Sequence, residues 1–189
     1  MKRWIAFIAV GTVLLASCGS ETTAQESAPS TPTEVQLLTW VSNPPMEPLE
    51  VINGDMCDVS NISQRGDAFR CYTESEIFDP CFVSEGGAVC PTDPFSNSYT
   101  LILISGDAGM MDEPTAEGDP WGIVLSDGAQ CTFLSGATEV RGDLRWNYAC
   151  SNDLMLWGSV DDTTAQWTID SSSDLETPLE RVTIAKVIY

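Results

Sequence analysis

The sequence predicts an all-β protein: mostly antiparallel, arranged as a meander, a sandwich or a barrel-like sheet, stapled by disulfides and with few helices. Short apolar and β-branched runs recur between Gly, Pro, Asp and Asn residues, which is typical of strands joined by turns. Helical periodicity is weak and is noticeable only at 35–40. An even number of cysteines follows an export signal, and such a set favours disulfides.

The start of the chain has the composition of a signal for export. The basic pair Lys2 and Arg3 precedes an apolar run from Trp4 to Leu15. This run is too short and wrongly flanked for a permanent membrane span. We therefore expect residues 1–17 to be a signal peptide, and the residues that end it indicate that it is a lipoprotein signal peptide.

The residues "LASC" at 15–18 resemble the lipobox of bacterial lipoproteins, whose cysteine is diacylated on its sulfur and begins the mature protein. We expect Cys18 to carry palmitate-type chains that anchor an extracytoplasmic protein to the cell membrane or the outer membrane. In the alternative interpretation, Cys18 is an ordinary residue of a secretory peptide that is cleaved elsewhere. Gly19 permits the outer membrane but does not distinguish Gram-negative from Gram-positive envelopes.

A polar tether precedes the folded domain. Residues 19–34 are rich in Ser, Thr, Pro and Glu and have no aliphatic residue larger than alanine, so they cannot bury enough apolar surface to fold. We expect 18–35 to be the lipidated cysteine and a disordered tether, and 36–189 to be a single disulfide-rich β-domain. The net charge of −20 should repel nucleic acid, and we expect no nucleic-acid partner and no cofactor.

The six cysteines after Cys18 are best explained as disulfides. Zinc sites usually place cysteines in close pairs with histidine, but these cysteines are far apart and the chain contains no histidine. A thioredoxin-like redox site needs C-x-x-C, which does not occur. Staples are therefore favoured over metal and redox chemistry.

One pairing follows from the expected strands. Asp127-Gly128 lies between apolar runs and indicates a type I′ hairpin. If the next strands pair about the turn at 141–143, Cys131 faces Cys150 on one side of the sheet. In the same register Phe133 faces Tyr148 and Ser135 faces Trp146.

The remaining four cysteines are assigned by the same argument. Cys81 and Cys90 flank the turn at 85–87 in a short hairpin, which leaves Cys57 and Cys71 as partners around 64–66. Four cysteines allow three pairings, and rearrangements such as Cys71 with Cys81 stay open. Further strands are expected at 99–105, 154–160, 165–170 and 181–189.

Several segments together resemble a known domain: "RGDAFRC", "IFDPCF", "AVC", "SDGAQCTFLSGAT" and "NYAC". They are similar to a poorly characterised Cys-rich extracytoplasmic domain of bacterial secreted proteins and lipoproteins, over about 53–189. The resemblance implies no activity, so no catalytic or binding residue is taken from it.

Two groups of residues are candidates for a ligand surface. The loop at 105–122 carries Asp107, Asp112 and Asp119, whose carboxylates could bind Ca²⁺ or serve a glycosidase, although a solvated loop explains them more simply. Tryptophans could form an aromatic platform for a sugar or a peptide, or pack in the core. This set comprises Trp121, Trp157 and Trp167, together with Trp146, which the strand register places in the core.

Two arginine motifs have simpler structural explanations. The tripeptide Arg-Gly-Asp occurs at 65–67 and 141–143, where Gly-Asp is expected to form a turn. Arg70 and Asp79 lie beside cysteines, and an ion pair between them is favoured over a role in ligand binding.

The expected function is a non-enzymatic binding or interaction module of the cell envelope, whose partner is an unknown envelope protein or glycan. No catalytic residue is assigned, because triads that use histidine are excluded by composition. The alternative is an envelope hydrolase that acts on glycan with carboxylates of the 107–119 loop. No metal site is expected.

Overall fold

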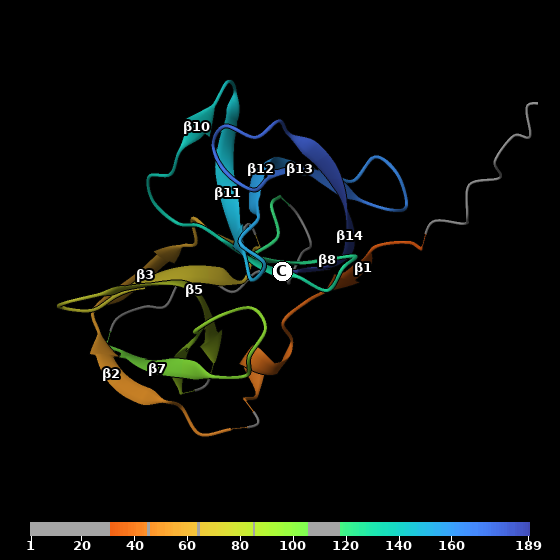
Figure 1. The fold of residues 1–189 in the computed structure, drawn as a ribbon. Coiled ribbons are helices and arrows are strands. Elements are labelled where there is room, and N and C mark those ends of the chain that lie inside the picture. The colour runs from red at the N-terminus through yellow and green to blue at the C-terminus, as the bar shows by residue number, and fades with distance from the viewer. Residues whose placement is uncertain (1–30, 45, 64, 85, 106–117) are drawn as a thin grey trace, which may run out of the picture.

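The protein consists of two curled β-sheets stacked against each other (Figure 1). We describe it from a computed structural model, over residues 31–44, 46–63, 65–84, 86–105 and 118–189. A short 3₁₀ turn, η1 (Trp40–Ser42), interrupts the β-structure, and within these ranges no helix has the length and apolar character of a membrane span. The prediction of an all-β, disulfide-stapled fold is confirmed.

The C-terminal half forms a closed antiparallel barrel. Its six strands pair in sequence, and the last strand pairs again with the first. They are β8 (Gly122–Leu125), β9 (Gln130–Phe133), β11 (Leu144–Cys150), β12 (Met155–Asp161), β13 (Thr168–Ser172) and β14 (Glu180–Ile188). Two short strands extend this sheet: β1 (Glu34–Gln36), parallel to β14, and β10 (Val140–Arg141), antiparallel to β11.

The barrel is filled by apolar side chains that alternate along its strands. Ile123, Tyr148, Leu156, Ile169 and Ile184 each have an exposed fraction of 0%. Alternation of inward and outward residues is the property from which the sequence predicts these strands. Burial of these side chains therefore stabilises the barrel.

The hairpin at Asp127-Gly128 forms as predicted, but with a different turn. Gly128 has a φ of +91°, whereas Asp127 does not take the positive φ that a type I′ turn requires. Instead, the Asp127 carboxylate accepts a 2.9 Å hydrogen bond from the Ala129 N–H. A side-chain-capped turn thus joins β8 to β9.

The second sheet contains six strands in the order β2, β7, β6, β5, β4, β3. Strands β2 and β7 are parallel, and the other pairs are antiparallel. The strands are β2 (Glu50–Gly54), β3 (Met56–Val59), β4 (Ala68–Tyr72), β5 (Ile77–Ser84), β6 (Gly87–Pro91) and β7 (Tyr99–Ile104).

Gly54 allows the two ends of this sheet to approach each other. It ends β2, and β3 begins two residues later at the opposite edge. A Cβ atom at Gly54 would overlap Ile102 Cγ2 and would lie 3.2 Å from the Tyr72 oxygen. Glycine is therefore required where the sheet curls back on itself.

A shared core joins the two sheets. Ala68, Phe82 and Val89 of the second sheet pack in one cluster with Trp121 and Ile188, which flank or belong to the barrel. The end of the chain lies between the two sheets (Figure 1). One continuous apolar layer therefore fixes how the sheets sit relative to each other.

The folded part includes residues that the sequence assigns to the tether. Glu34 and Val35 lie in β1, and Thr33 Oγ1 donates a 2.7 Å hydrogen bond to the Ile184 oxygen. The segment at 35–40, where helical periodicity is noticeable, contributes to β1 and leads into η1. The parallel pairing with β14 explains why the start of this segment is a strand and not a helix.

Candidate functional site

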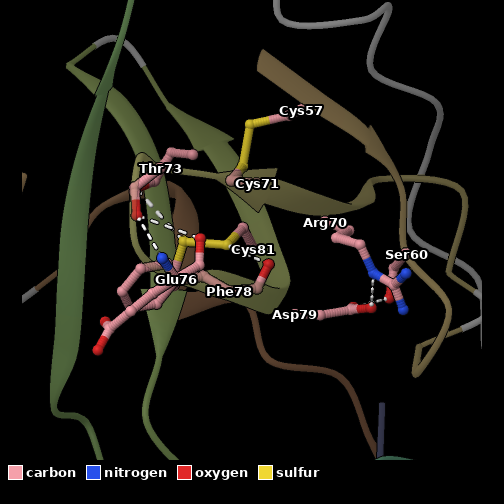
Figure 2. Close-up of a disulfide and its surroundings, with 11 residues drawn as sticks. Cys57, Ser60, Arg70, Cys71, Thr73, Glu76, Phe78, Asp79 and Cys81 are labelled. Atoms are coloured by element: carbon pink, nitrogen blue, oxygen red, sulfur yellow. Dashed lines mark hydrogen bonds and ion pairs between the residues drawn. A yellow bond between two sulfur atoms is a disulfide. The ribbon is translucent and has the colours of Figure 1, made fainter. Parts of the chain in front are cut away.

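Three disulfides connect neighbouring antiparallel strands, as predicted. Cys57–Cys71 joins β3 to β4, Cys81–Cys90 joins β5 to β6, and Cys131–Cys150 joins β9 to β11. Figure 2 shows the first of these beside Cys81. Phe133 also faces Tyr148 as predicted. Such bonds are typical of an oxidising, extracytoplasmic compartment.

Three buried sulfur atoms lie together in the second sheet. The Sγ atoms of Cys71, Cys81 and Cys90 are all within 4.8 Å of one another. A group of this kind resembles a set of metal ligands, but each sulfur is already bonded in a disulfide. Since metal coordination requires thiolates, this cluster is structural in the oxidised protein.

Next to these disulfides, Asp79 organises a polar network. Its carboxylate accepts hydrogen bonds from the Ser60 hydroxyl, from the Asn61 N–H at 3.0 Å and from Arg70 Nε at 2.9 Å. Figure 2 shows Arg70 and Ser60 converging on Asp79. The Asp79 side chain is only 6% exposed and that of Arg70 is 23% exposed, so the acid is enclosed while the guanidinium reaches the surface.

The charge of Arg70 is stabilised by these neighbours. Burial opposes the charged form, but hydrogen bonds and charge from Asp79 and Tyr72 outweigh it and raise the pKa of Arg70. With its oxygen turned toward Arg70, the Asn61 amide accepts from both terminal nitrogens of the guanidinium. The ion pair predicted between Arg70 and Asp79 is present.

Arg70 borders an open cleft between the two sheets, which we call the inter-sheet cleft. Its volume is about 350 Å³, within the size range of small-ligand sites. One wall comes from β4 and the β3–β4 connection, and the other from β11 and the residues after β9. The lining residues are Asn61, Ile62, Arg70, Phe133, Leu134, Ser135, Gly136 and Arg145.

Arg145 is the second cation of the inter-sheet cleft. Its terminal nitrogens donate to Asn147 Oδ1 at 2.6 Å, to the Leu134 oxygen at 2.8 Å and to the Gly136 oxygen at 2.7 Å. Its guanidinium also lies 5.6 Å from the centre of the Phe133 ring, a cation–π contact. These neutral partners fix the side chain against the cleft wall.

The charge of Arg145 is not neutralised by an ion pair within the described ranges. Of the arginines in the described ranges, Arg65, Arg70 and Arg181 have a carboxylate within 4.0 Å. Arg145 and the β10 residue Arg141 have none there. In a chain of net charge −20, a half-buried guanidinium held only by neutral acceptors is unusual, because acidic partners are plentiful.

Asp119 is the carboxylate whose titration responds to Arg145. Burial raises the pKa of Asp119, while hydrogen bonds from Ser159 Oγ and the Val160 main chain and the charge of Arg145 act in the opposite direction. The hydroxyl of Ser159 lies 3.3 Å from Asp119 Oδ2. Asp107 and Asp112, the other acids of the predicted set, lie outside the described residues.

The tryptophans do not form the aromatic platform considered from the sequence. Trp121 is 4% exposed and Trp157 is 1% exposed, and the Trp157 indole donates to Ser172 Oγ at 2.8 Å. Trp167 is partly buried against the barrel core. The buried rings of Trp121 and Trp157 offer no surface to a sugar or a peptide, so these two residues fit the core packing that the sequence also allowed.

Trp146 is half-buried rather than part of the core, contrary to the predicted register. A register shift between Trp146 and Tyr148 interrupts the pairing of β11 with β12, and β9 ends at Phe133, before Ser135 can face Trp146. Such a shift moves a side chain off its expected face. The indole instead donates to the Tyr148 oxygen at 2.6 Å.

The two Arg-Gly-Asp tripeptides have different environments. At 65–67 the Arg65 side chain is 1% exposed and paired with Asp67, so this copy is structural. At 141–143 the motif forms the turn of the β10–β11 hairpin, where Gly142 has a φ of +62°. Arg141 is turned toward the Thr177 oxygen, at 2.5 Å.

The inter-sheet cleft is favoured over the other hollows because two arginines line it, whereas the hollows beside Arg181 and Lys186 have one cation each. A hollow of about 430 Å³ beside Thr31 and Thr183 has no charged side chain in its lining. Arg145 and Phe133 were not predicted from the sequence to form a ligand surface. The available signal was the scarcity of basic residues: the chain has eight, two of them Lys2 and Arg3 at its start, so each of the other six is informative.

No family model, curated protein or solved structure matches this chain.

Proposed function

We propose that this protein is a non-enzymatic binding module of the bacterial cell envelope, anchored by lipid on Cys18 and carried on its polar tether. The observation that carries the proposal is the inter-sheet cleft, whose two walls come from different sheets and whose Arg145 has no carboxylate partner among the described residues. A site that joins two sheets of one stapled fold is preorganised, which lowers the entropic cost of binding.

The surrounding framework supports this proposal. Disulfides Cys57–Cys71 and Cys131–Cys150 join β3 to β4 and β9 to β11, so each wall of the cleft adjoins a stapled pair of strands. The disulfides also fit the extracytoplasmic location that the signal peptide predicts. The predicted lipid and tether would place the domain close to other envelope components.

Asp119 is the residue that supports the alternative function, an envelope hydrolase. A half-buried carboxyl with a raised pKa has a property of a general acid, and envelope glycan is the substrate class that we considered from the sequence. A hydrolase would lose turnover in the triple variant Asp107→Asn, Asp112→Asn, Asp119→Asn. A binding module would retain its ligand in the same variant.

The proposal is tested by site-specific photo-crosslinking in intact cells. A photoreactive residue replaces Ser135, which is exposed on the rim of the cleft, or Leu175, which is 49% exposed in the β13–β14 connection. We expect a discrete adduct with an envelope component from position 135 and none from position 175. Equal adducts from both positions, or none from 135, would contradict a binding role for the cleft.

A further inference from the structure

We propose that the inter-sheet cleft recognises a single carboxylate group on a ligand with an apolar portion. This inference rests on the proposed function for its biological role and adds the chemical class of the ligand. Three properties of the cleft support it: the free donors of Arg145, the charge of the surrounding protein and the apolar lining.

Arg145 has donors left over after its contacts with the protein. Its Nη2 atom donates to two main-chain oxygens and its Nη1 atom donates to Asn147 Oδ1. A guanidinium has five N–H groups, so the Nε–H and one Nη1–H remain without an acceptor among the described residues. These donors, on a fixed and charged group, suit an oxyanion.

The charge of the whole protein limits which anion binds. A net charge of −20 repels polyanions over the length of their chain. An anionic group that enters the cleft at one point experiences Arg145 at close range and the remaining charges at longer, screened distances. A singly charged carboxylate is therefore favoured over a phosphate dianion or a polyanion.

The lining of the cleft accounts for the apolar portion of the ligand. Ile62, Phe133 and Leu134 contribute apolar side chains beside the two arginines. The Phe133 ring is itself held edge-on against Tyr148, with 5.2 Å between ring centroids. A ligand that combines a carboxylate with a small apolar body matches both parts of this surface.

Arg70 plays a different part from Arg145 in this site. Asp79 engages its Nε atom and Asn61 covers its terminal nitrogens, so its charge is largely compensated. It contributes to the polar wall of the cleft. Arg145 is therefore the group that we expect to contact the carboxylate.

The test is a titration of the mature chain, made lipid-free by Cys18→Ala, with four probes at constant ionic strength: benzoate, its neutral analogue benzamide, acetate and inorganic phosphate. Binding is followed by NMR at the Gly136 amide and the Arg145 Nε–H. We expect saturable chemical-shift changes with benzoate and weaker binding of acetate. The affinity for benzamide should be roughly tenfold or more below that for benzoate, because a hydrogen bond between charged groups is lost. Phosphate should bind more weakly than benzoate.

Two pairs of variants localise the binding. Arg145→Gln should lower the affinity for benzoate roughly tenfold or more. Arg181→Gln removes the same charge from an exposed ion pair on β14 and should leave that affinity unchanged. Because Arg145→Gln also removes contacts to the loop after β9, Ser135→Glu provides a second test that keeps them. Its carboxylate should compete for Arg145, while Ser135→Gln should bind as the native protein does.

Several outcomes would overturn the inference: equal binding of benzoate and benzamide, tighter binding of phosphate than of benzoate, or equal losses in the Arg145 and Arg181 variants. Failure of this inference and failure of the proposed function are distinguishable. An adduct from position 135 without charge-dependent benzoate binding would retain the binding module and reject the carboxylate. Benzoate binding without any envelope adduct would retain the carboxylate site and reject the envelope binding module.

Discussion

The Nη1 atom of Arg65 donates a 2.8 Å hydrogen bond to the main-chain oxygen of Tyr189, 124 residues further along the chain. The same guanidinium donates to the Leu38 oxygen at 3.2 Å and forms a two-point ion pair with Asp67. It also lies 4.6 Å from the centre of the Phe82 ring. One buried arginine thus links the connection before β4 to the residues that follow the adjacent strands β1 and β14.

The first prediction concerns this arginine. Arg65→Met leaves the Asp67 carboxylate and two main-chain oxygens without their donor, and loss of one partner from a buried pair costs about 3 kcal/mol or more. We expect a lower urea midpoint with this loss in the free energy of unfolding. Arg181→Met, which removes an exposed ion pair, should cost less than about 1 kcal/mol. Equal effects would show that Arg65 does not join the sheets.

The second prediction concerns the disulfides. The oxidised domain should have a mass six hydrogens below that of the fully reduced chain. Cys57–Cys71 should be reduced before Cys81–Cys90, because Cys57 is half-buried on the edge strand β3, whereas Cys81 and Cys90 are buried. Timed treatment with a dithiol, alkylation and mass spectrometry give the order. First reduction of Cys81–Cys90 would contradict the described accessibility.

The third prediction concerns alkaline stability. Burial and the charges of Asp162 and Asp119 raise the pKa of Tyr189 to about 12, and burial with the charges of Asp119 and Tyr189 raises the pKa of Tyr148 well above its ordinary value. A raised folded pKa favours the neutral phenol, so its stabilisation is complete below the unfolded pKa of about 10 and is lost as pH rises toward the folded value.

Thermal unfolding between about pH 9 and about pH 12 should therefore show a falling midpoint. Tyr189→Phe and Tyr148→Phe should each flatten this fall, since phenylalanine has no proton to lose. Each variant also loses a hydrogen bond, from Tyr189 to the Gly118 oxygen or from Tyr148 to the Pro120 oxygen, so the slope with pH is compared rather than the midpoint. A slope like that of the native protein would reject the assignment.

The fourth prediction concerns the anchor. Cys18→Ala should release the protein from the membrane fraction and abolish its labelling by a palmitate analogue, because the lipid supplies the membrane affinity. Cys57→Ala with Cys71→Ala serves as the matched control, since it removes cysteines of the folded domain. Continued membrane retention of Cys18→Ala would contradict the lipid anchor.

The local parts of the fold follow from sequence reasoning. Cys131 and Cys150 are 19 residues apart, and alternation along two strands is sufficient to place them opposite each other. The same holds for Cys57–Cys71 and Cys81–Cys90, at separations of 14 and 9. Turn residues and strand periodicity act over such short distances.

The long-range parts of the fold do not follow from sequence reasoning. Strand β1 pairs with β14 in parallel, with Glu34 opposite Lys186, and no pattern near residue 34 specifies that partner. The inter-sheet cleft brings Arg70 and Arg145 together from different sheets, which requires the stacking of the sheets to be known. The irregularity in β11 likewise depends on its pairing with β12, so alternation alone misplaces Trp146.

The most direct test of the ligand site is the anomalous scattering of a bromine atom in crystals of the mature Cys18→Ala protein grown with 4-bromobenzoate. The account predicts a bromine peak in the inter-sheet cleft beside Phe133 and Leu134, with the carboxylate on the Nε–H of Arg145. In crystals of Arg145→Gln the peak should be lost. A bromine position outside the cleft, or equal occupancy in the Arg145→Gln crystals, would contradict the assignment of this cleft as a carboxylate site.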